Sequence, residues 1–294
     1  MKFTKMHGCG NDYIYVNGFT EKIADKVSFV KAVSDRHFGI GGDGAIFINP
    51  SDEADFEMEM YNADGSRAEM CGNGIRCVAK FVYDKGLTDQ THISIISCGK
   101  IKYLDLTVSD GKVVSVRVNM GEPELLAKQI PVSSDFLADS QVKNEPIEVL
   151  QKTYHMTCVS MGNPHAVLFI NCGADAGKFE SEQVKELELS GIGPCFENHP
   201  FFPKRTNTEF VEVIDKKHVN MRVWERGTGE TLACGTGCSA TAVAAVLNGF
   251  TDRKITVNVL GGAIEIEWDE KTNCVFMTGP ATTVFEGEFP WPVE

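Results

Sequence analysis

Hydrophobic and polar residues alternate along several short segments of the chain. In the segment 56–62, FEMEMYN, the residues Phe56, Met58 and Met60 alternate with polar neighbours, which predicts a half-buried strand. The segment 219–225, VNMRVWE, has the same alternation. Further alternating segments lie at 93–97, 101–106, 113–119, 209–214, 255–259, 264–268 and 275–278. This pattern favours a strand-rich α+β protein with few β-α-β units.

Two segments have a helical pattern instead. After residue 71, apolar residues recur at a helical period, at Ile75, Val78, Ala79 and Val82. This spacing predicts an amphipathic helix that ends at Lys85-Gly86. The segment 238–249, CSATAVAAVLNG, is almost entirely small or apolar, which predicts a deeply buried helix that ends at Asn248-Gly249. Each helix follows a predicted strand and a turn, NADGS at 62–66 and ERGTGETLA at 225–233.

The sequence contains an internal repeat. CGNG at 71–74 and CGTG at 234–237 place two cysteines 163 residues apart, each at the start of a predicted helix. Three further pairs match in the same order: Gly10-Asn11 with Gly162-Asn163, Gly99 and Ile101 with Gly262 and Ile264, and Gly121 with Gly279. A length of 294 residues by itself favours two domains. We therefore interpret the chain as two structurally similar halves that arose from an internal repeat.

A cysteine at a helix N-terminus is a candidate for chemistry. It meets unpaired backbone N–H groups and the positive end of the helix dipole, and both favour the thiolate. Adjacent glycines leave room for an anion to reach the same N–H groups. Two such sites suit a cleft in which one thiol removes a proton from a carbon while the other delivers one. Three alternatives stay open: a packing role, a redox pair between the two thiols, and zinc binding with Cys77 or Cys238 as a second ligand.

Composition narrows the class of partner. A net charge of −13 argues against nucleic acid or an anionic membrane surface. No apolar run approaches the roughly 20 residues of a membrane span, and the first residues do not have the pattern of a signal peptide. The ten cysteines include no C-x-x-C pair, so we expect reduced thiols in the cytoplasm.

Several loop residues are weaker candidates. GIGGDG at 39–44 matches a dinucleotide-binding pattern, but it follows a helical segment and precedes the strand AIFIN, which is the reverse of the required context. We expect it to line the cleft. His165 is a candidate base, and Glu225-Arg226 stands where it could hold a charged substrate. Asparagines also occur in glycine- or turn-rich loops, at Asn11, Asn62, Asn73, Asn163 and Asn207.

With these residues assembled, the chain closely resembles the diaminopimelate epimerases, which are amino acid racemases that work without pyridoxal phosphate. The matching segments are HGCGNDY (7–13), RHFGIGGDG (36–44), YNADGSRAEMCGNGIRC (61–77), SMGNPHAV (160–167), FPKRTNTEF (202–210), ERGTGETLACGTG (225–237) and GPATTVFEG (279–287). The resemblance implies two pseudo-symmetric domains, each a β-sheet wrapped around a central helix, with the active site in the cleft between them. The last residues are implied to return to the first domain, which gives halves of 1–122 with 281–294 and of 123–280.

The resemblance also implies an activity and its residues. It implies interconversion of LL- and meso-2,6-diaminopimelate, in lysine and peptidoglycan precursor biosynthesis, with Cys71 and Cys234 as the acid and base and with no metal or cofactor. The α-carboxylate would be held by backbone N–H groups of Gly72, Asn73, Gly235 and Thr236. The ammonium or carboxylates would contact Asn62, Glu225 and Arg226, and the distal amino acid end would contact Asn11, Asn163 and Asn207. His165 follows in the same motif, near the reacting centre.

The chain departs from the family pattern at two positions. Gly44 stands where many members have glutamine, and Phe285 stands where a tyrosine is common at the family's homodimer contact. Proline racemases and hydroxyproline epimerases share the implied fold and the two cysteines, but their first motif reads CGHG, whereas Asn73 stands at that position here. PhzF-type isomerases lack the two-thiol arrangement. A redox or metal-binding protein is the alternative from another class.

Overall fold

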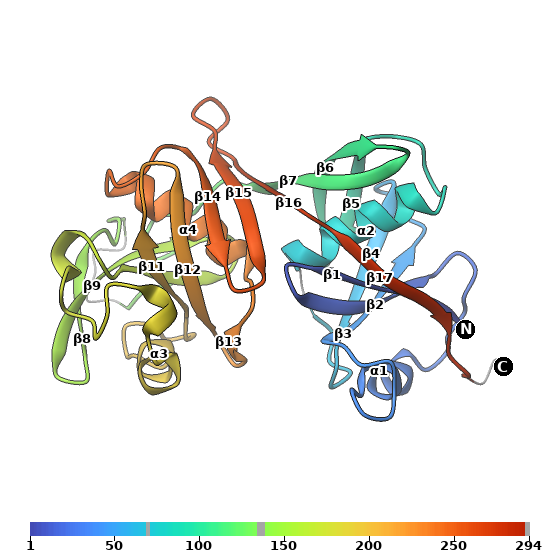
Figure 1. The fold of residues 1–294 in the computed structure, drawn as a ribbon, viewed down its shortest axis with the longest axis horizontal. Helices are drawn as coiled ribbons and strands as arrows, with labels where there is room; N and C mark the ends of the chain where they lie inside the picture. Colours follow the sequence, from blue (N-terminus) through green and yellow to red (C-terminus); the bar gives the residue numbers. More distant parts are fainter. Residues whose placement is uncertain (69–70, 134–138, 292–294) are drawn as a thin grey trace. The chain divides into compact units, whose positions relative to one another are not determined.

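The computed structural model describes residues 1–68, 71–133 and 139–291, so Glu69 and Met70, which precede the CGNG segment, lie outside the described residues. The chain divides into two compact units, coloured along the sequence in Figure 1. The first unit comprises Met1–Asn119 and Thr278–Glu294, and the second comprises Met120–Met277. Each unit is strand-rich and has one buried helix packed against its strands, which confirms the predicted α+β class.

Within the described residues, the strands of the first unit pair in a continuous order. Their order is β17 (Thr282–Glu288), β1 (Lys2–Gly8), β2 (Asn11–Asn17), β3 (Gly44–Asn49), β4 (Phe56–Asn62), β5 (His92–Ser97), β6 (Lys100–Ser109) and β7 (Lys112–Gly121). The helix α2 (Gly72–Asp84) packs on β1, β2 and β6, and α1 (Lys26–Ser34) packs on β2, β3 and β4. The last strand of the chain thus pairs with the first.

Helix α2 is buried along most of its length. The four predicted apolar positions are fully buried, and the helix ends at Asp84 with Lys85 as its C-cap, as predicted. The prediction of an amphipathic helix was wrong in one respect, because no polar face is exposed to solvent. Every residue from Gly72 to Val82 is buried, since strands β1, β2 and β6 pack against the helix.

The second unit repeats this arrangement. Its strands pair in the order β8 (Glu145–Val149), β9 (Lys152–Ser160), β10 (Pro164–Phe169), β11 (Asn207–Val213), β12 (His218–Glu225), β14 (Lys254–Val259) and β15 (Gly262–Trp268). The remaining elements are β13 (Gly229–Thr231), β16 (Val275–Gly279), α3 (Leu189–Glu197) and two short 3-10 helices at Gly173–Asp175 and Val184–Glu186. Helix α4 (Gly235–Leu247) is deeply buried against β9, β10, β11, β14 and β15, as its composition predicted.

The pairing pattern makes the two units pseudo-symmetric. In the first, β2 is parallel to β3, β3 is antiparallel to β4, and β4 is parallel to β5. In the second, β10, β11, β12 and β14 repeat the same series. Helices α2 and α4 occupy equivalent places in this series, after the third strand and before the fourth.

The predicted strands are all present, but several elements differ from the sequence pattern. The segment 225–233 was predicted as a turn, and it contains β13, which pairs with β12. Strands β1, β2, β8, β9, β10 and β17 and helix α3 were not predicted. Strand β10 is buried at every position, so its residues do not alternate, and α3 contains Pro194 and two glycines. No helix within the described residues is long and apolar enough to cross a membrane.

Candidate active site

The two cysteines occupy the same position relative to their helices. Cys71 is the N-cap of α2 with φ −122° and ψ 114°, and Cys234 is the N-cap of α4 with φ −119° and ψ 111°. The Cys71 Sγ accepts a hydrogen bond from the Gly74 N–H at 3.3 Å, and the Cys234 Sγ accepts one from the Gly237 N–H at 3.4 Å. The predicted placement at helix N-termini is therefore confirmed, and each sulfur receives an N–H group that a helix start leaves unpaired.

In the first unit, Asn11 lies against the thiol. The Cys71 Sγ donates to the Asn11 Oδ1 at 3.0 Å, and the Asn11 Nδ2 donates to the Asp43 Oδ2 at 2.8 Å. Asn11 is presented by a tight turn between β1 and β2, in which Cys9 and Gly10 have φ of 52° and 83°. The Asp43 contact fixes the amide so that its oxygen faces the sulfur.

The other candidates of the first unit differ in their surroundings. Asn73 is buried, and its Oδ1 accepts from the Arg76 Nη2 at 3.0 Å. Gly72 is the first residue of α2, and its carbonyl accepts from the Arg76 Nη1 at 3.2 Å. Asn62 is exposed, and its Nδ2 donates to the Ser66 Oγ at 3.0 Å. The backbone allows no side chain at Gly44, because a Cβ there would lie 2.0 Å from the Tyr61 carbonyl oxygen.

Arg76 is a residue that the sequence reasoning missed. Its side chain is fully buried at the start of α2, and its Nε donates to the Pro280 carbonyl at 3.1 Å. Gly8 and Gly279 make room for it, since a Cβ at either position would approach the guanidinium to 3.1 Å. The signal available in the sequence was a charged residue directly after Ile75, the first apolar position of the predicted helix. Arg76 ties the first turn of α2 to the chain's returning C-terminal segment.

In the second unit, the thiol is surrounded by acidic groups. Burial raises the pKa of the Cys234 thiol well above its ordinary value, and the charges of Glu225 and Glu209 raise it further. The Cys234 Sγ and the Thr236 Oγ1 are 3.4 Å apart. Burial also raises the pKa of the Glu225 carboxyl, which accepts a hydrogen bond from the Thr231 hydroxyl. Burial and the two carboxylate charges thus favour the protonated form of the Cys234 sulfur.

His165 belongs to a buried chain of polar groups. Its Nδ1 lies 2.7 Å from the Glu209 Oε1, and its Nε2 lies 3.0 Å from the Asn163 Oδ1. The side chains of His165 and Glu209 are both fully buried. The sequence reasoning missed Glu209, although an acidic residue at an inward position of a predicted strand was a signal for it.

Asn207 and Arg226 are joined through the backbone. The buried Asn207 side chain donates from Nδ2 to the Pro164 carbonyl at 3.1 Å and accepts at Oδ1 from the Arg226 N–H at 2.8 Å. The Arg226 side chain is exposed and donates from Nη1 to the Lys204 carbonyl at 3.0 Å. Gly235 begins α4 directly after Cys234.

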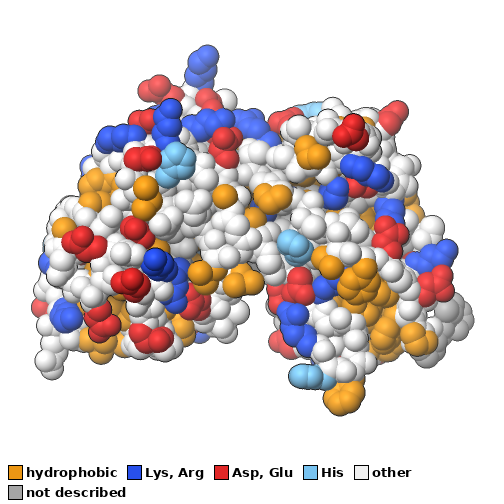
Figure 2. Space-filling view, viewed as in Figure 1, with side chains coloured by type: hydrophobic (Ala, Val, Ile, Leu, Met, Phe, Trp, Pro, Cys, Tyr) orange, Lys and Arg blue, Asp and Glu red, His pale blue; other side chains and the backbone are white. Residues whose placement is uncertain are grey.

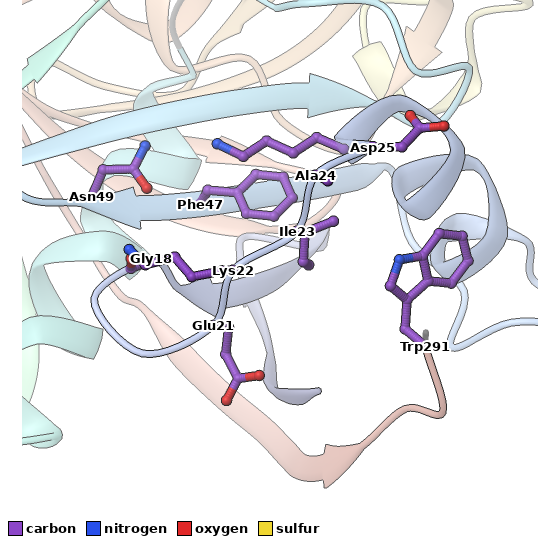
Figure 3. A pocket seen from close by; sticks show the side chains of 10 residues that line it. Gly18, Glu21, Lys22, Ile23, Ala24, Asp25, Phe47, Asn49 and Trp291 are labelled. Atoms are coloured by element: carbon purple, nitrogen blue, oxygen red, sulfur yellow. The ribbon is translucent and has the colours of Figure 1, made fainter. Parts of the chain in front are cut away.

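The structure thus gathers the predicted residues into one site in each unit. The first unit brings together Asn11, Cys71, Gly72 and Asn73, and Asn62 lies at the end of the neighbouring strand β4. The second brings together Asn163, His165, Asn207, Glu225, Arg226, Cys234, Gly235 and Thr236. The first unit also has a separate pocket of about 540 Å³, lined by Phe47, Asn49 and Trp291, among others (Figure 3). None of the predicted site residues lines this pocket.

The family model and the curated relatives name the same family. The sequence model of the family described as diaminopimelate epimerase matches residues 3–126 and 157–284. A diaminopimelate epimerase of Agathobacter rectalis is 58% identical over 98% of this chain and 99% of its own, and one of Desulfovibrio desulfuricans is 50% identical over 98% of each.

Solved structures show the same fold at low identity. A hydroxyproline epimerase from Agrobacterium vitis has a TM-score of 0.64 at 12% identity and covers 98% of this chain and 90% of its own. A Bacillus anthracis protein of the PhzF family has a TM-score of 0.65 at 15% identity and covers 99% of each chain. These two likenesses concern the fold alone.

Proposed function

The chain belongs to the diaminopimelate epimerase family, and we propose that it interconverts LL- and meso-2,6-diaminopimelate by proton transfer between two thiols and the substrate's α-carbon. The observation that carries the proposal is the pair of matching N-capping cysteines, Cys71 on α2 and Cys234 on α4. Inversion at carbon needs a base on one face and an acid on the other, and a duplicated unit supplies one such group from each half. We retain 1–122 with 281–294 and 123–280 as the extents of these halves.

The helix starts supply the electrostatic part of the reaction. Removing an α-proton builds negative charge on the adjacent carboxylate, and hydrogen-bond donors already aimed at that charge stabilise the transition state. The first residues of the two helices, Gly72, Asn73, Gly235 and Thr236, have backbone N–H groups that can donate to such a carboxylate. These four residues would hold the reacting carboxylate, and no metal or cofactor enters the proposed reaction.

The thiols have different roles at rest. Burial and two carboxylates raise the pKa of Cys234, so this thiol acts as the acid in the direction in which Cys71 acts as the base. Cys71 acts as the base only after its thiol has lost the proton that it donates to the Asn11 Oδ1. In the reverse direction the roles exchange, as microscopic reversibility requires. The thiolate needs a site that excludes water to attack so weak a carbon acid.

Charged side chains of the second unit suit an amino acid substrate. The exposed Arg226 guanidinium can bind a carboxylate with two parallel N–H donors, while the Glu225 carboxylate suits an ammonium group. Asn62 would complete this set. The distal amino acid end would be bound by Asn11, Asn163 and Asn207, and His165 would support the site through its contact with Asn163.

We further propose that the enzyme is a homodimer that uses β17. This strand is exposed along most of its length, with 54% of Val284 and 45% of Phe285 accessible. In Figure 2, hydrophobic side chains gather on the visible face of the first unit, around the place where Figure 1 shows β17 crossing it. An exposed strand with apolar side chains is a typical pairing surface.

We place the enzyme in the cytoplasm, because ten cysteines without a C-x-x-C pair are typical of a reducing compartment.

The proposed activity is tested by incubating the purified protein with LL-diaminopimelate and separating the stereoisomers over time. The expected result is an approach to a mixture of LL and meso forms from either side. Parallel incubations with L-proline and trans-4-hydroxy-L-proline should give no inversion. Inversion of a proline substrate without inversion of diaminopimelate would contradict the proposed substrate.

A further inference from the structure

The carboxylate of Glu209 lies behind the second site and contacts it through His165. Strands β10 and β11 are parallel, with His165 opposite Asn207, so His165 and Glu209 lie on the same face of the sheet. Both side chains are fully buried, and the His165 Nδ1 is 2.7 Å from the Glu209 Oε1. The pair is therefore a desolvated contact between an imidazole and a carboxylate.

The imidazole has an acceptor at each nitrogen. Its Nδ1 faces the Glu209 carboxylate, and its Nε2 faces the Asn163 Oδ1 at 3.0 Å. A neutral imidazole has one donor and one acceptor, so only the doubly protonated ring satisfies both contacts. The Glu209 Oε2 has no hydrogen-bond partner within the described residues. A buried carboxylate with so few donors needs a cation beside it, and the imidazolium supplies that charge.

The state of the ring decides the orientation of the Asn163 amide. Because His165 donates to Oδ1, the two hydrogens of the Asn163 Nδ2 are directed away from the ring. Asn163 is only half-buried, so these donors can reach a ligand. A carboxylate, which only accepts hydrogen bonds, is the group that such an amide binds.

We propose that Glu209 is a positioning residue for substrate specificity: it keeps His165 doubly protonated, and His165 in turn fixes Asn163 so that its N–H donors face a carboxylate at the distal end of the substrate. This inference rests on the proposed function, in which Asn163 contacts the distal amino acid end of diaminopimelate. Glu209 touches no reacting atom: it acts on the substrate through His165, and its charge separately raises the pKa of the Cys234 thiol.

A comparison of the two units argues that the carboxylate is not needed for packing. The 163-residue repeat places Ile46 of β3 where Glu209 stands in β11, and Gly74 where Gly237 stands. A Cβ at Gly74 would lie 2.9 Å from the Ile46 Cδ1, and a Cβ at Gly237 would lie 2.7 Å from the Glu209 Oε1. Both side chains fill the same space beneath the helix start. The first unit fills it with an apolar residue, so the charge in the second unit has another role.

The test is the substitution Glu209→Gln, which keeps the shape and removes the charge. The glutamine Oε1 can accept from Nδ1–H of a neutral ring, whose Nε2 then becomes an acceptor. In that tautomer the Asn163 amide turns to donate to Nε2, and this turn presents Oδ1 to the substrate carboxylate. We expect the KM for LL-diaminopimelate to rise about tenfold or more, the size of one lost charge-assisted hydrogen bond, while kcat changes less than about threefold.

A spectroscopic readout separates this role from a structural one. In ligand-free wild-type protein, ¹⁵N NMR should show a hydrogen on both His165 nitrogens, and in Glu209→Gln it should show a hydrogen on one. The matched control is Glu212→Gln on the same strand. Glu212 accepts hydrogen bonds from the Val184 N–H and the Asn220 side chain. This substitution should leave the protonation of the His165 ring and the KM unchanged.

Two results would overturn the proposal: a neutral His165 ring in the wild type, or a Glu209→Gln variant with an unchanged KM and a reduced kcat. If the Glu209→Gln variant does not fold, the protonation of the His165 ring in the wild type alone tests the proposal. The NMR readout needs no turnover, so failure of the proposed epimerase activity and failure of this inference are observed separately.

Discussion

Cys71 and Cys234 each accept a hydrogen bond from the backbone N–H three residues further along, Cys71 at 3.3 Å and Cys234 at 3.4 Å. The two sulfurs therefore have the same backbone setting, whereas their side-chain surroundings differ. The Cys71 thiol donates to the Asn11 amide, and the Cys234 thiol lies beside the charges of Glu225 and Glu209. When the acid and the base are both cysteines, their surroundings must give the two thiols different pKa values. Equal backbone contacts combined with unequal neighbouring charges provide this difference.

Replacing either thiol with a hydroxyl should abolish inversion. We expect Cys71→Ser and Cys234→Ser each to lower kcat at least about 100-fold, because a serine hydroxyl is a far weaker acid than a thiol. The variants should keep the wild-type circular dichroism spectrum and melting temperature within a few degrees. Near-normal turnover in either variant would exclude the two-thiol reaction.

The stability of the protein should depend on pH through Cys234. The pKa of this thiol is raised above its ordinary value of 9.0, first by burial and then by the charges of Glu225 and Glu209. The unfolded chain therefore loses this proton before the folded one, and the contribution to the free energy of unfolding is complete below about pH 9 and is lost as the pH rises further. Urea titrations of the wild type and Cys234→Ser between about pH 8 and pH 10 measure the difference. Parallel pH profiles for the two proteins would contradict the raised pKa.

The fully buried guanidinium of Arg76 should contribute strongly to stability. Arg76→Gln removes hydrogen bonds to the Pro280 and Gly72 carbonyls in the protein interior. We expect the free energy of unfolding to fall by about 2–4 kcal/mol. The control is Arg67→Gln, since the Arg67 side chain is 50% exposed in its ion pair with Glu59 and should be worth at most about 1 kcal/mol. Equal losses for the two variants, measured by urea denaturation, would show that Arg76 has no special role.

The glycine that follows Cys234 by three residues should tolerate no side chain. A Cβ at Gly237 would lie 2.7 Å from the Glu209 Oε1 and 3.3 Å from the Cys234 Sγ. We expect Gly237→Ala to cost about 1–3 kcal/mol of stability and to lower kcat. Gly191→Ala on α3 is the control, because nothing lies within 4 Å of its Cβ position. Its effect should stay within about 1 kcal/mol in either direction.

The proposed dimer is tested on its exposed strand. Phe285→Lys places a charge on β17, where the phenylalanine is 45% exposed, and should convert the dimer to a monomer in sedimentation equilibrium. Val114→Lys, at a 50% exposed position of β7, should leave the association state unchanged. A wild-type protein that sediments as a monomer would refute the dimer directly.

Sequence periodicity predicted most of the strands because they have one buried face. It predicted β4 with both of its bounds, and it predicted the ends of α2 and α4 from Lys85-Gly86 and Asn248-Gly249. It did not predict β10, whose six residues are all buried and so carry no alternation. The helix positions of the cysteines followed from the repeat of CGxG.

The side-chain networks behind the thiols were not predictable in this way. Arg76 and Glu209 are charged residues in buried positions, and their partners come from segments far away in sequence. A pattern of hydrophobic and polar residues indicates which face is buried, but it does not indicate which polar groups meet inside. The pairing of His165 with Glu209 became visible only with the register of β10 and β11.

The central claim, inversion by two thiols on opposite faces of one carbon, is tested most directly by the early incorporation of deuterium. LL-diaminopimelate is incubated in deuterated water, and the reaction is stopped after a few per cent conversion. Mass spectrometry then measures deuterium separately in the meso product and in the remaining LL substrate. The two-thiol account predicts one deuterium at the inverted carbon of the product and essentially none in the remaining substrate, because different groups remove and deliver the proton. Product that retains the original hydrogen, or substrate that exchanges as fast as product forms, would contradict it.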